Sequence, residues 1–389
     1  MLVEAQGFYT HVNSSVIVDT PHDMRFEVAM KMKPGPILGG SMFPELSLLD
    51  LYQQSDLIAI AQIGRSAIVE NNGSLKLQKT ALHISAQLKG ENSQQVIPFY
   101  HWVDDVHPTT LNQGDRLLVL LRRRESEDGK RLDGYEATGW GDSIKELEDR
   151  ALAIYRQRIE ELTAIYQRGN PDPSELVEWL VRCVEEPATR GEGVRKLIEG
   201  LYRLASQREQ ENSDKSRTGE AEESADQTED EIEDSDEQAA DDEAKMRVES
   251  VKLAAALTQD HKNRLTGALF GIAELSEADM DLVNLIVELG DERLAPYLVS
   301  QLRRVADDSP RFAESLVWMI ARVIKDEDLN RLADDYHDAA TYDESEFDDR
   351  TDRQNSTRNR RPGDVTVAAI KRGAMLKDFL KLVEYKTRR

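Results

Sequence analysis

The chain has 389 residues, of which 39% are hydrophobic and 32% are charged, and its formal net charge at pH 7 is −24. This length is ample for two compact domains with connecting segments, and the excess of charged residues predicts that part of the chain is unfolded. Net acidity of this size repels nucleic-acid phosphates at long range, which disfavours a general nucleic-acid binder.

Cys183 is the only cysteine, which excludes an internal disulfide and a zinc site built from cysteines. It occupies a core-facing position of a predicted helix, so we expect a buried residue and not a catalytic thiol. The sequence contains no apolar run long enough for a transmembrane helix and no signal-peptide pattern. The cytoplasm is therefore the default location, although a true start at Met24, Met30 or Met32 would leave a secreted or periplasmic location open.

Residues 1–45 are predicted to be a poorly ordered N-terminal extension, and residues 46–142 carry a pattern of short β-strands. A strand in DLIAIAQI is followed by a turn at Asn71–Gly73 and by a strand with alternating apolar residues. Three further strands are expected in QQVIPFYHW, in RLLVLLRRR and in GYEATGWG. Short strands without a long helix between them predict a small closed or half-closed barrel.

Four of these segments together resemble an OB-like barrel of the netrin and metalloproteinase-inhibitor (TIMP) type, which occurs in bacterial multidomain proteins. They are the opening SDLIAIAQI, the strand end LKG at Leu88–Gly90, the strand GDRLLVLLR and the closing GY. The resemblance covers residues 46–142 and is a pattern of strands. Protease inhibition in that family depends on N-terminal cysteines that this chain lacks, so inhibitor activity is not implied.

From residue 143 onward the apolar period changes from two residues to 3.6, which predicts a helical array over residues 143–209 and 246–336. Residues that can cap these helices are Thr258, Ser276 and Ser309. The segment LVELGDERLAPYLVSQLRRV, with Pro296 in the first turn of its second helix, resembles the helical pair of HEAT-like repeats. The predicted fold class is therefore multidomain β plus α, with an OB-like β-barrel followed by a HEAT-like α-solenoid array.

Residues 210–245 are predicted to be a disordered acidic insert, because Gly219–Ala244 contains fourteen acidic residues and no Lys or Arg. A polar linker is expected over 337–363 and a basic amphipathic helix over 364–389, with Val367, Ile370, Met375, Phe379, Leu382 and Val383 on its apolar face. This helix could cap the array, contact an anionic membrane peripherally, dock in a partner's groove or fold back onto the acidic insert. Its candidate contact residues are Lys371, Lys377 and Lys381.

The segment HWVDDVH contains the only candidate metal ligands, His101, Asp105 and His107. Their spacing at a strand end fixes no common geometry, so an ordinary surface loop is the favoured interpretation. The acidic stretch Asp343–Asp352 lacks the glycine that a calcium loop requires at its sixth position. We therefore expect neither a metal nor another cofactor.

Arg122, Arg123 and Arg124 are candidate contact residues for an oligonucleotide, which an OB-like barrel would bind with cations and stacking aromatics. The aromatic residues expected near them are Tyr100, Trp102, Tyr135 and Trp140. Neighbouring acidic residues dilute this charge, so a barrel core with a charged strand end is the favoured interpretation.

The known phosphate-binding, dinucleotide-binding and nucleophile motifs do not occur in the sequence. We therefore expect a non-catalytic interaction or scaffold protein that binds a protein partner through helical repeats and a β-barrel recognition module. Two alternatives stay open. One is an OB-type nucleic-acid-binding protein, and the other is an enzyme or inhibitor-like module with its site at the barrel mouth, near His101 and Asp105.

Overall fold

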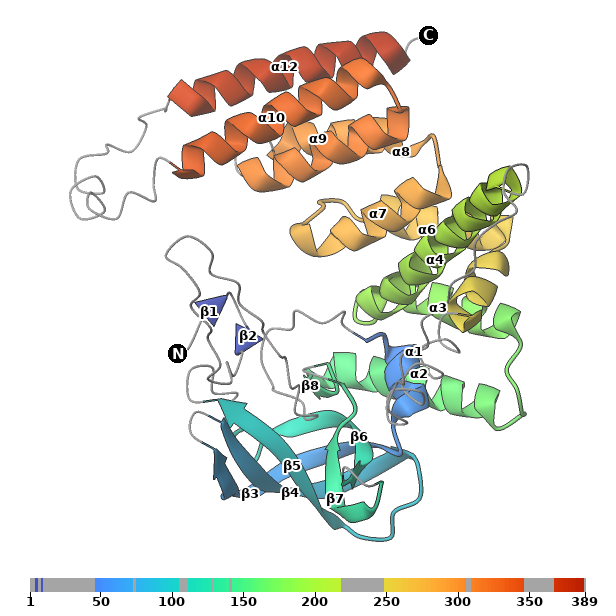
Figure 1. The fold of residues 1–389 in the computed structure, drawn as a ribbon, viewed down its shortest axis with the longest axis vertical. Helices are drawn as coiled ribbons and strands as arrows, with labels where there is room; N and C mark the ends of the chain where they lie inside the picture. The colour runs from blue at the N-terminus through green and yellow to red at the C-terminus, as the bar shows by residue number, and fades with distance from the viewer. Residues whose placement is uncertain are drawn as a thin grey trace, which may run out of the picture. The chain divides into compact units, whose positions relative to one another are not determined.

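The computed structural model describes residues 4–5, 8–9, 46–72, 75–104, 111–126, 129–139, 142–217, 248–305, 309–345 and 367–387. A six-stranded sheet comes first in this part of the chain, and helices follow (Figure 1). The chain divides into two compact units, which are described separately below. The first contains Met1–Trp179 and Glu186–Lys196, and the second contains Leu180–Glu185 and Leu197–Arg389.

The strands expected from the sequence are present in the first unit. They are β3 (Leu57–Asn72), β4 (Leu75–Lys89), β5 (Val96–Asp104), β6 (Arg116–Glu125) and β7 (Arg131–Ala137), followed by the short β8 (Ile144–Glu146). Strand β3 pairs with β4 and also with β6, so the pairing forms a closed circuit β3-β4-β5-β7-β6-β3. Within this circuit β5 and β7 are parallel and the other pairs are antiparallel. Two shorter strands, β1 (Glu4–Ala5) and β2 (Phe8–Tyr9), pair with each other.

Alternate side chains of these strands form one hydrophobic core. Its members are Leu57, Ala59, Ala61, Ile63, Leu82, Ile97, Phe99, Leu117, Val119, Leu121, Tyr135 and Ala137. Gly134 allows β7 to approach β5 closely, because its φ is +89° and an added Cβ would lie 2.7 Å from the carbonyl oxygen of Pro98. The glycine therefore permits the parallel pairing that completes the circuit.

Helices α1 (Leu48–Gln54) and α2 (Asp149–Tyr166) contact strands of the circuit, α1 at β6 and α2 at β4. In β3 and β6 the residues between the core positions, such as Ile58 and Leu118, are also fully buried. When a strand is covered on both faces, its sequence is a continuous apolar run and does not alternate between apolar and polar residues. This burial explains the uninterrupted LIAIA and LLVLL of these two strands.

Both ends of α1 are held by polar contacts. Ser47 and Asp50 form a capping box at its N-terminus. At its C-terminus the Lys89 ammonium donates to the carbonyl oxygens of Ser55, at 2.7 Å, and of Tyr52. Burial lowers the pKa of Lys89 from its usual 10.5. A strand side chain thus satisfies carbonyls that the helix itself leaves without partners.

A buried ionic network connects α1 to the start of α4 (Arg190–Arg217). The Lys196 ammonium lies 2.5 Å from the Asp50 carboxylate, and both side chains are almost fully buried. The Glu192 carboxylate, also buried, accepts from the Leu48 backbone N–H, the Tyr155 hydroxyl and the Lys145 ammonium, each at 2.9 Å. Charge-assisted hydrogen bonds inside the unit therefore connect segments that are about 140 residues apart in the sequence.

In the second unit α6 contacts α7, and α7 contacts α9; α9 also contacts α8 and α10, and α10 contacts α12. Their bounds are α6 (Gln259–Phe270), α7 (Met280–Leu289), α8 (Leu294–Val305), α9 (Pro310–Ile324), α10 (Glu327–Ser345) and α12 (Val367–Thr387), with the short η1 (Glu277–Asp279) before α7. Helix α3 (Pro173–Glu185) contributes residues to both units, and its Cys183 is buried, as predicted. No helix in the described segments is both long enough and apolar enough to cross a membrane.

The residues Leu289, Gly290 and Asp291 form the turn between α7 and α8. Gly290 has φ +72°, in the left-handed region that favours glycine after a helix. The next residue, Asp291, accepts hydrogen bonds from the backbone and side chain of Arg293 and from the Thr266 hydroxyl. The hydrogen bond from the Arg293 side chain is the main reason why the pKa of Asp291 falls to about 2. Asp291 thus connects this turn to α6.

Two predicted segments differ from the structure at their boundaries. Helix α4 continues to Arg217, into the segment predicted as an acidic insert, and the rest of that insert, from residue 218 to 245, lies outside the described residues. Helix α10 continues to Ser345, into the predicted polar linker. Both extensions consist mainly of polar residues, so the apolar period that indicates a helix is lost before the helix ends.

Helix α12 packs on α10, side by side with it (Figure 1). The side chains buried on it are Leu376, Phe379 and Val383. Ile370, which we expected on the apolar face, is instead 62% exposed, so that part of the prediction is wrong. The Lys386 ammonium pairs with Asp326, and Arg303 pairs with Glu384. These contacts hold the C-terminal half of the helix, whereas Ile370 lies in its first turn.

Candidate binding site

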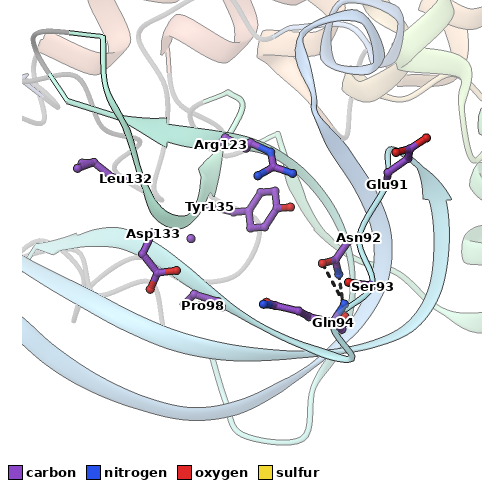
Figure 2. A pocket seen from close by; sticks show the side chains of 10 residues that line it. Glu91, Asn92, Ser93, Gln94, Pro98, Arg123, Leu132, Asp133 and Tyr135 are labelled. Carbon is purple, nitrogen blue, oxygen red and sulfur yellow. Dashed lines mark hydrogen bonds between the residues drawn. The ribbon is translucent and has the colours of Figure 1, made fainter.

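A pocket of about 290 Å³ opens on the first unit (Figure 2). The loop between β4 and β5 forms one wall with Glu91, Asn92, Ser93 and Gln94. Strand β7 forms the other wall with Leu132, Asp133, Gly134 and Tyr135, and Pro98 and Arg123 complete the lining. The pocket is therefore built from the parallel β5–β7 pair, the adjoining strand β6 and the loop that precedes β5.

Arg123 and Tyr135 form the centre of the pocket. The guanidinium carbon lies 5.6 Å from the centre of the Tyr135 ring, and Figure 2 shows the guanidinium beside the ring. The Arg123 backbone N–H donates to the Asp56 carboxylate at 2.7 Å, which fixes the strand at this point. Tyr135 is 7% exposed and belongs to the hydrophobic core. A rigid aromatic ring thus supports a cation at the surface.

The loop wall has a defined shape because Asn92 bonds across it. The Asn92 amide donates to the Gln94 carbonyl at 2.7 Å, and its side-chain oxygen accepts from the Gln94 N–H at 3.2 Å. These are the contacts drawn as dashed lines in Figure 2. Such local bonds are typical of Asx turns. Figure 2 shows the Gln94 side chain directed toward Pro98.

The three predicted arginines lie near one another, but each has a different environment. Arg122 forms a 2.7 Å ion pair with Glu136, and Arg123 lines the pocket. The Arg124 guanidinium lies 4.0 Å from the centre of the Tyr100 ring, above which the Lys79 ammonium also lies at 5.3 Å. Cations thus already lie over both of these rings.

His101 is fully buried in β5, where its ring stacks on Phe99 with the ring centres 5.0 Å apart. Neither ring nitrogen has a hydrogen-bond partner in the described part of the chain. Burial disfavours the charged imidazolium and lowers the pKa of His101 from 6.5 to about 4. The side chain thus occupies the interior of the sheet and not a surface loop.

The buried His101 should make the protein acid-sensitive. Between pH 6.5 and 4 the histidine of the unfolded chain binds a proton that the folded one does not. The contribution of His101 to the free energy of unfolding is therefore fully present above pH 6.5 and is lost as the pH falls to 4. The shift corresponds to a loss of about 3 kcal/mol. Urea unfolding of His101→Leu at pH 7.5 and pH 4 should show this dependence reduced, whereas the exposed His83→Leu should retain it. Equal pH dependence in wild type and His101→Leu would contradict the assignment.

Asp105 and His107, the other candidate metal ligands, lie outside the described residues. Among the residues that the structure does describe, no group of three or more His, Cys, Asp or Glu side chains is placed to hold a metal ion. The predicted lysines Lys371, Lys377 and Lys381 are all exposed on α12, and Lys381 lies 3.2 Å from Asp378. Trp140, expected beside the arginines, also lies outside the described residues.

No family model matches the chain, and neither a curated protein nor a solved structure matches it.

Sequence reasoning identified Arg123 and Tyr135 but missed the loop wall of the pocket and the position of Lys79. The sequence ENSQ of this loop, Glu91–Gln94, is typical of an ordinary polar turn. Only its position between two strands sets it apart from other polar turns. Lys79 could have been found from strand register, because it pairs with Tyr100 across β4 and β5.

Proposed function

We propose that the chain is a non-catalytic recognition protein, in which an OB-like barrel and a HEAT-like helical array bind a protein partner. The strand order β3-β4-β5-β7-β6, closed by β3–β6 pairing, supports the OB-like barrel. The packing of successive helices from α8 to α12 supports the array. Arrays of this kind use extended surfaces for binding.

The observation that carries the proposal is the exposed face of α12. Lys371, Lys377 and Lys381 lie there, away from the buried Phe379 and Val383. The same helix exposes two large apolar side chains, Ile370 at 62% and Tyr385 at 52%. Exposed apolar residues mark protein interaction sites, and lysines beside them favour a partner of opposite charge, so the partner that fits this face is a protein with an acidic surface.

The test is a capture experiment with full-length protein in native lysate, read by mass spectrometry. Wild type should retain a partner at stoichiometric amounts, and the triple variant Lys371→Gln, Lys377→Gln and Lys381→Gln should lose it. The matched control removes three exposed charges elsewhere, through Arg131→Gln, Arg150→Gln and Lys252→Gln, and should retain the partner. Retention should also fall with added salt. If both triple variants retain the same proteins, or if no protein is retained at stoichiometry, the proposal fails.

A further inference from the structure

The outer half of strand β3 has a free edge. Residues Ile58–Gln62 pair with both β4 and β6, and the Ile63 N–H donates to the Asp115 carbonyl at 2.9 Å. Beyond this point β3 pairs with β4 on one side (Figure 1), and no other strand in the described part of the chain pairs with Ser66–Asn72. Outward-pointing backbone N–H and C=O groups along such an edge can pair with a further strand.

This edge also carries apolar side chains that the described fold leaves exposed. Every residue of Arg65–Asn72 is exposed, and the exposed fractions of Ile68 and Val69 are 58% and 51%. Ser66–Asn72 contains neither the lysine nor the proline with which proteins often protect a free edge. Isoleucine and valine favour strands, so the segment suits a strand that gains a neighbour. Backbone available for pairing beside exposed apolar residues is typical of a site where another strand binds.

A β-bulge brings two opposite charges onto one face of this edge. Ala67 lies opposite Lys79 of β4, and Glu70 lies opposite Leu77, with one extra β3 residue in between. The two β4 residues are two positions apart and therefore share a face, so Ala67 and Glu70 share that face as well. Arg65, two residues before Ala67, lies on the same face. This face thus has a cation at one end, a small residue in the middle and a carboxylate at the other end.

Both charged side chains are available to a partner. Among the described residues neither Arg65 nor Glu70 has an ion-pair partner, and Glu70 accepts a hydrogen bond from the Asn72 amide at 2.7 Å. A strand that pairs here in the antiparallel direction should therefore carry a carboxylate opposite Arg65 and a cation opposite Glu70. The same edge of a second chain, running in the opposite direction, has this order of charges by symmetry.

We propose that this edge of β3 binds the same edge of a second copy of the chain in an antiparallel, two-fold symmetric pair. The axis passes beside Ala67, which lies opposite Ala67 of the second copy. Counted outward in the register with β4, Arg65 of each copy then lies opposite Glu70 of the other, so that two ion pairs form. The pairing also removes apolar surface of Ile68 and Val69 from water. The edge belongs to the first unit and α12 to the second, so this proposal and the one for α12 can fail separately.

The test is sedimentation equilibrium of the full-length protein at about 0.15 M salt, which screens charges that are more than about 8 Å apart. One strand pairing buries less surface than a standard interface, so wild type should dimerise with a Kd between roughly 1 and 500 µM. Arg65→Glu and Glu70→Arg should each raise this Kd roughly ten-fold or more, because each change places like charges opposite one another at both ends. Arg150→Glu, the same charge reversal at an exposed position outside the edge, should leave the Kd unchanged.

Two further samples cover the case in which a single variant disturbs the fold. Arg65→Glu makes both charges of the edge acidic and Glu70→Arg makes both basic, so a mixture of these two variants should form a heterodimer although neither dimerises well alone. The double variant Arg65→Glu, Glu70→Arg should recover a Kd close to that of wild type.

Three results would overturn the proposal. The first is a wild type that stays monomeric over the whole concentration range, which would assign the edge to a strand of another protein. The second is dimerisation of both single variants as tightly as wild type, which would place the dimer contact elsewhere. The third is the failure of the mixture and of the double variant to restore dimerisation.

Discussion

Lys196→Met should lower the free energy of unfolding of the first unit by roughly 3–5 kcal/mol, because removing one member of a buried ion pair leaves the other charge uncompensated. Asp50 is 4% exposed, and its remaining contacts within the described segments are to Ser47. Hydrogen exchange of the α1 amides, together with urea unfolding, would measure the loss.

Two comparisons make this prediction specific. The exposed pair Arg156–Glu160, with side chains 54% and 52% exposed, should contribute far less, so Arg156→Met should lower the free energy of unfolding by less than about 1 kcal/mol. The double variant Asp50→Asn, Lys196→Met removes both charges and should recover much of the loss. If Lys196→Met lowered the free energy of unfolding as little as Arg156→Met does, the burial of the Asp50–Lys196 pair would not contribute to stability.

Glu192→Ala should destabilise the same unit by roughly 3–5 kcal/mol, since three donors lose one buried acceptor. The Leu48 N–H is the first amide of α1, so exchange at this amide should accelerate more than exchange in the core strands. Glu192→Gln keeps the shape but not the charge and should fall between wild type and Glu192→Ala.

The control for Glu192 is Glu146→Ala, because Glu146 is exposed on β8 and close in sequence to Lys145. Calorimetric melting should show a transition close to that of wild type for Glu146→Ala and a transition lowered by several degrees for Glu192→Ala. If the two variants melt together, the network does not stabilise the unit in the way that its geometry implies.

The strands of the first unit could be predicted because their apolar residues and turns are local signals. The burial of His101 could not be predicted, because a histidine after an aromatic strand residue is equally compatible with a metal ligand and with a core residue. The burial of the charged residues Glu192 and Lys196 could not be predicted either. They interrupt the apolar face of a helix, and the partners that stabilise their burial come from residues 48–50, far back in the sequence.

Helix α1 was missed although it carries a recognisable signal. Ser47 and Asp50 have the spacing of a capping box directly before an apolar run, which predicts the start of a helix. Its seven residues, Leu48–Gln54, are too few to show a helical period, and such a short segment is stable only through packing. In the second unit, Pro296 correctly marked the first turns of a helix, α8.

The link between Asp50 and Lys196 also affects how the chain can fold while it is being made. A ribosome adds residues one at a time, so the strands of the circuit are made before residue 192. Until then α1 has neither Glu192 for its first amide nor Lys196 for its buried carboxylate. Such distant contacts form late, and the completed first unit must wait until the start of α4 has emerged. During synthesis the strands therefore spend an interval without the charges that anchor their covering helix.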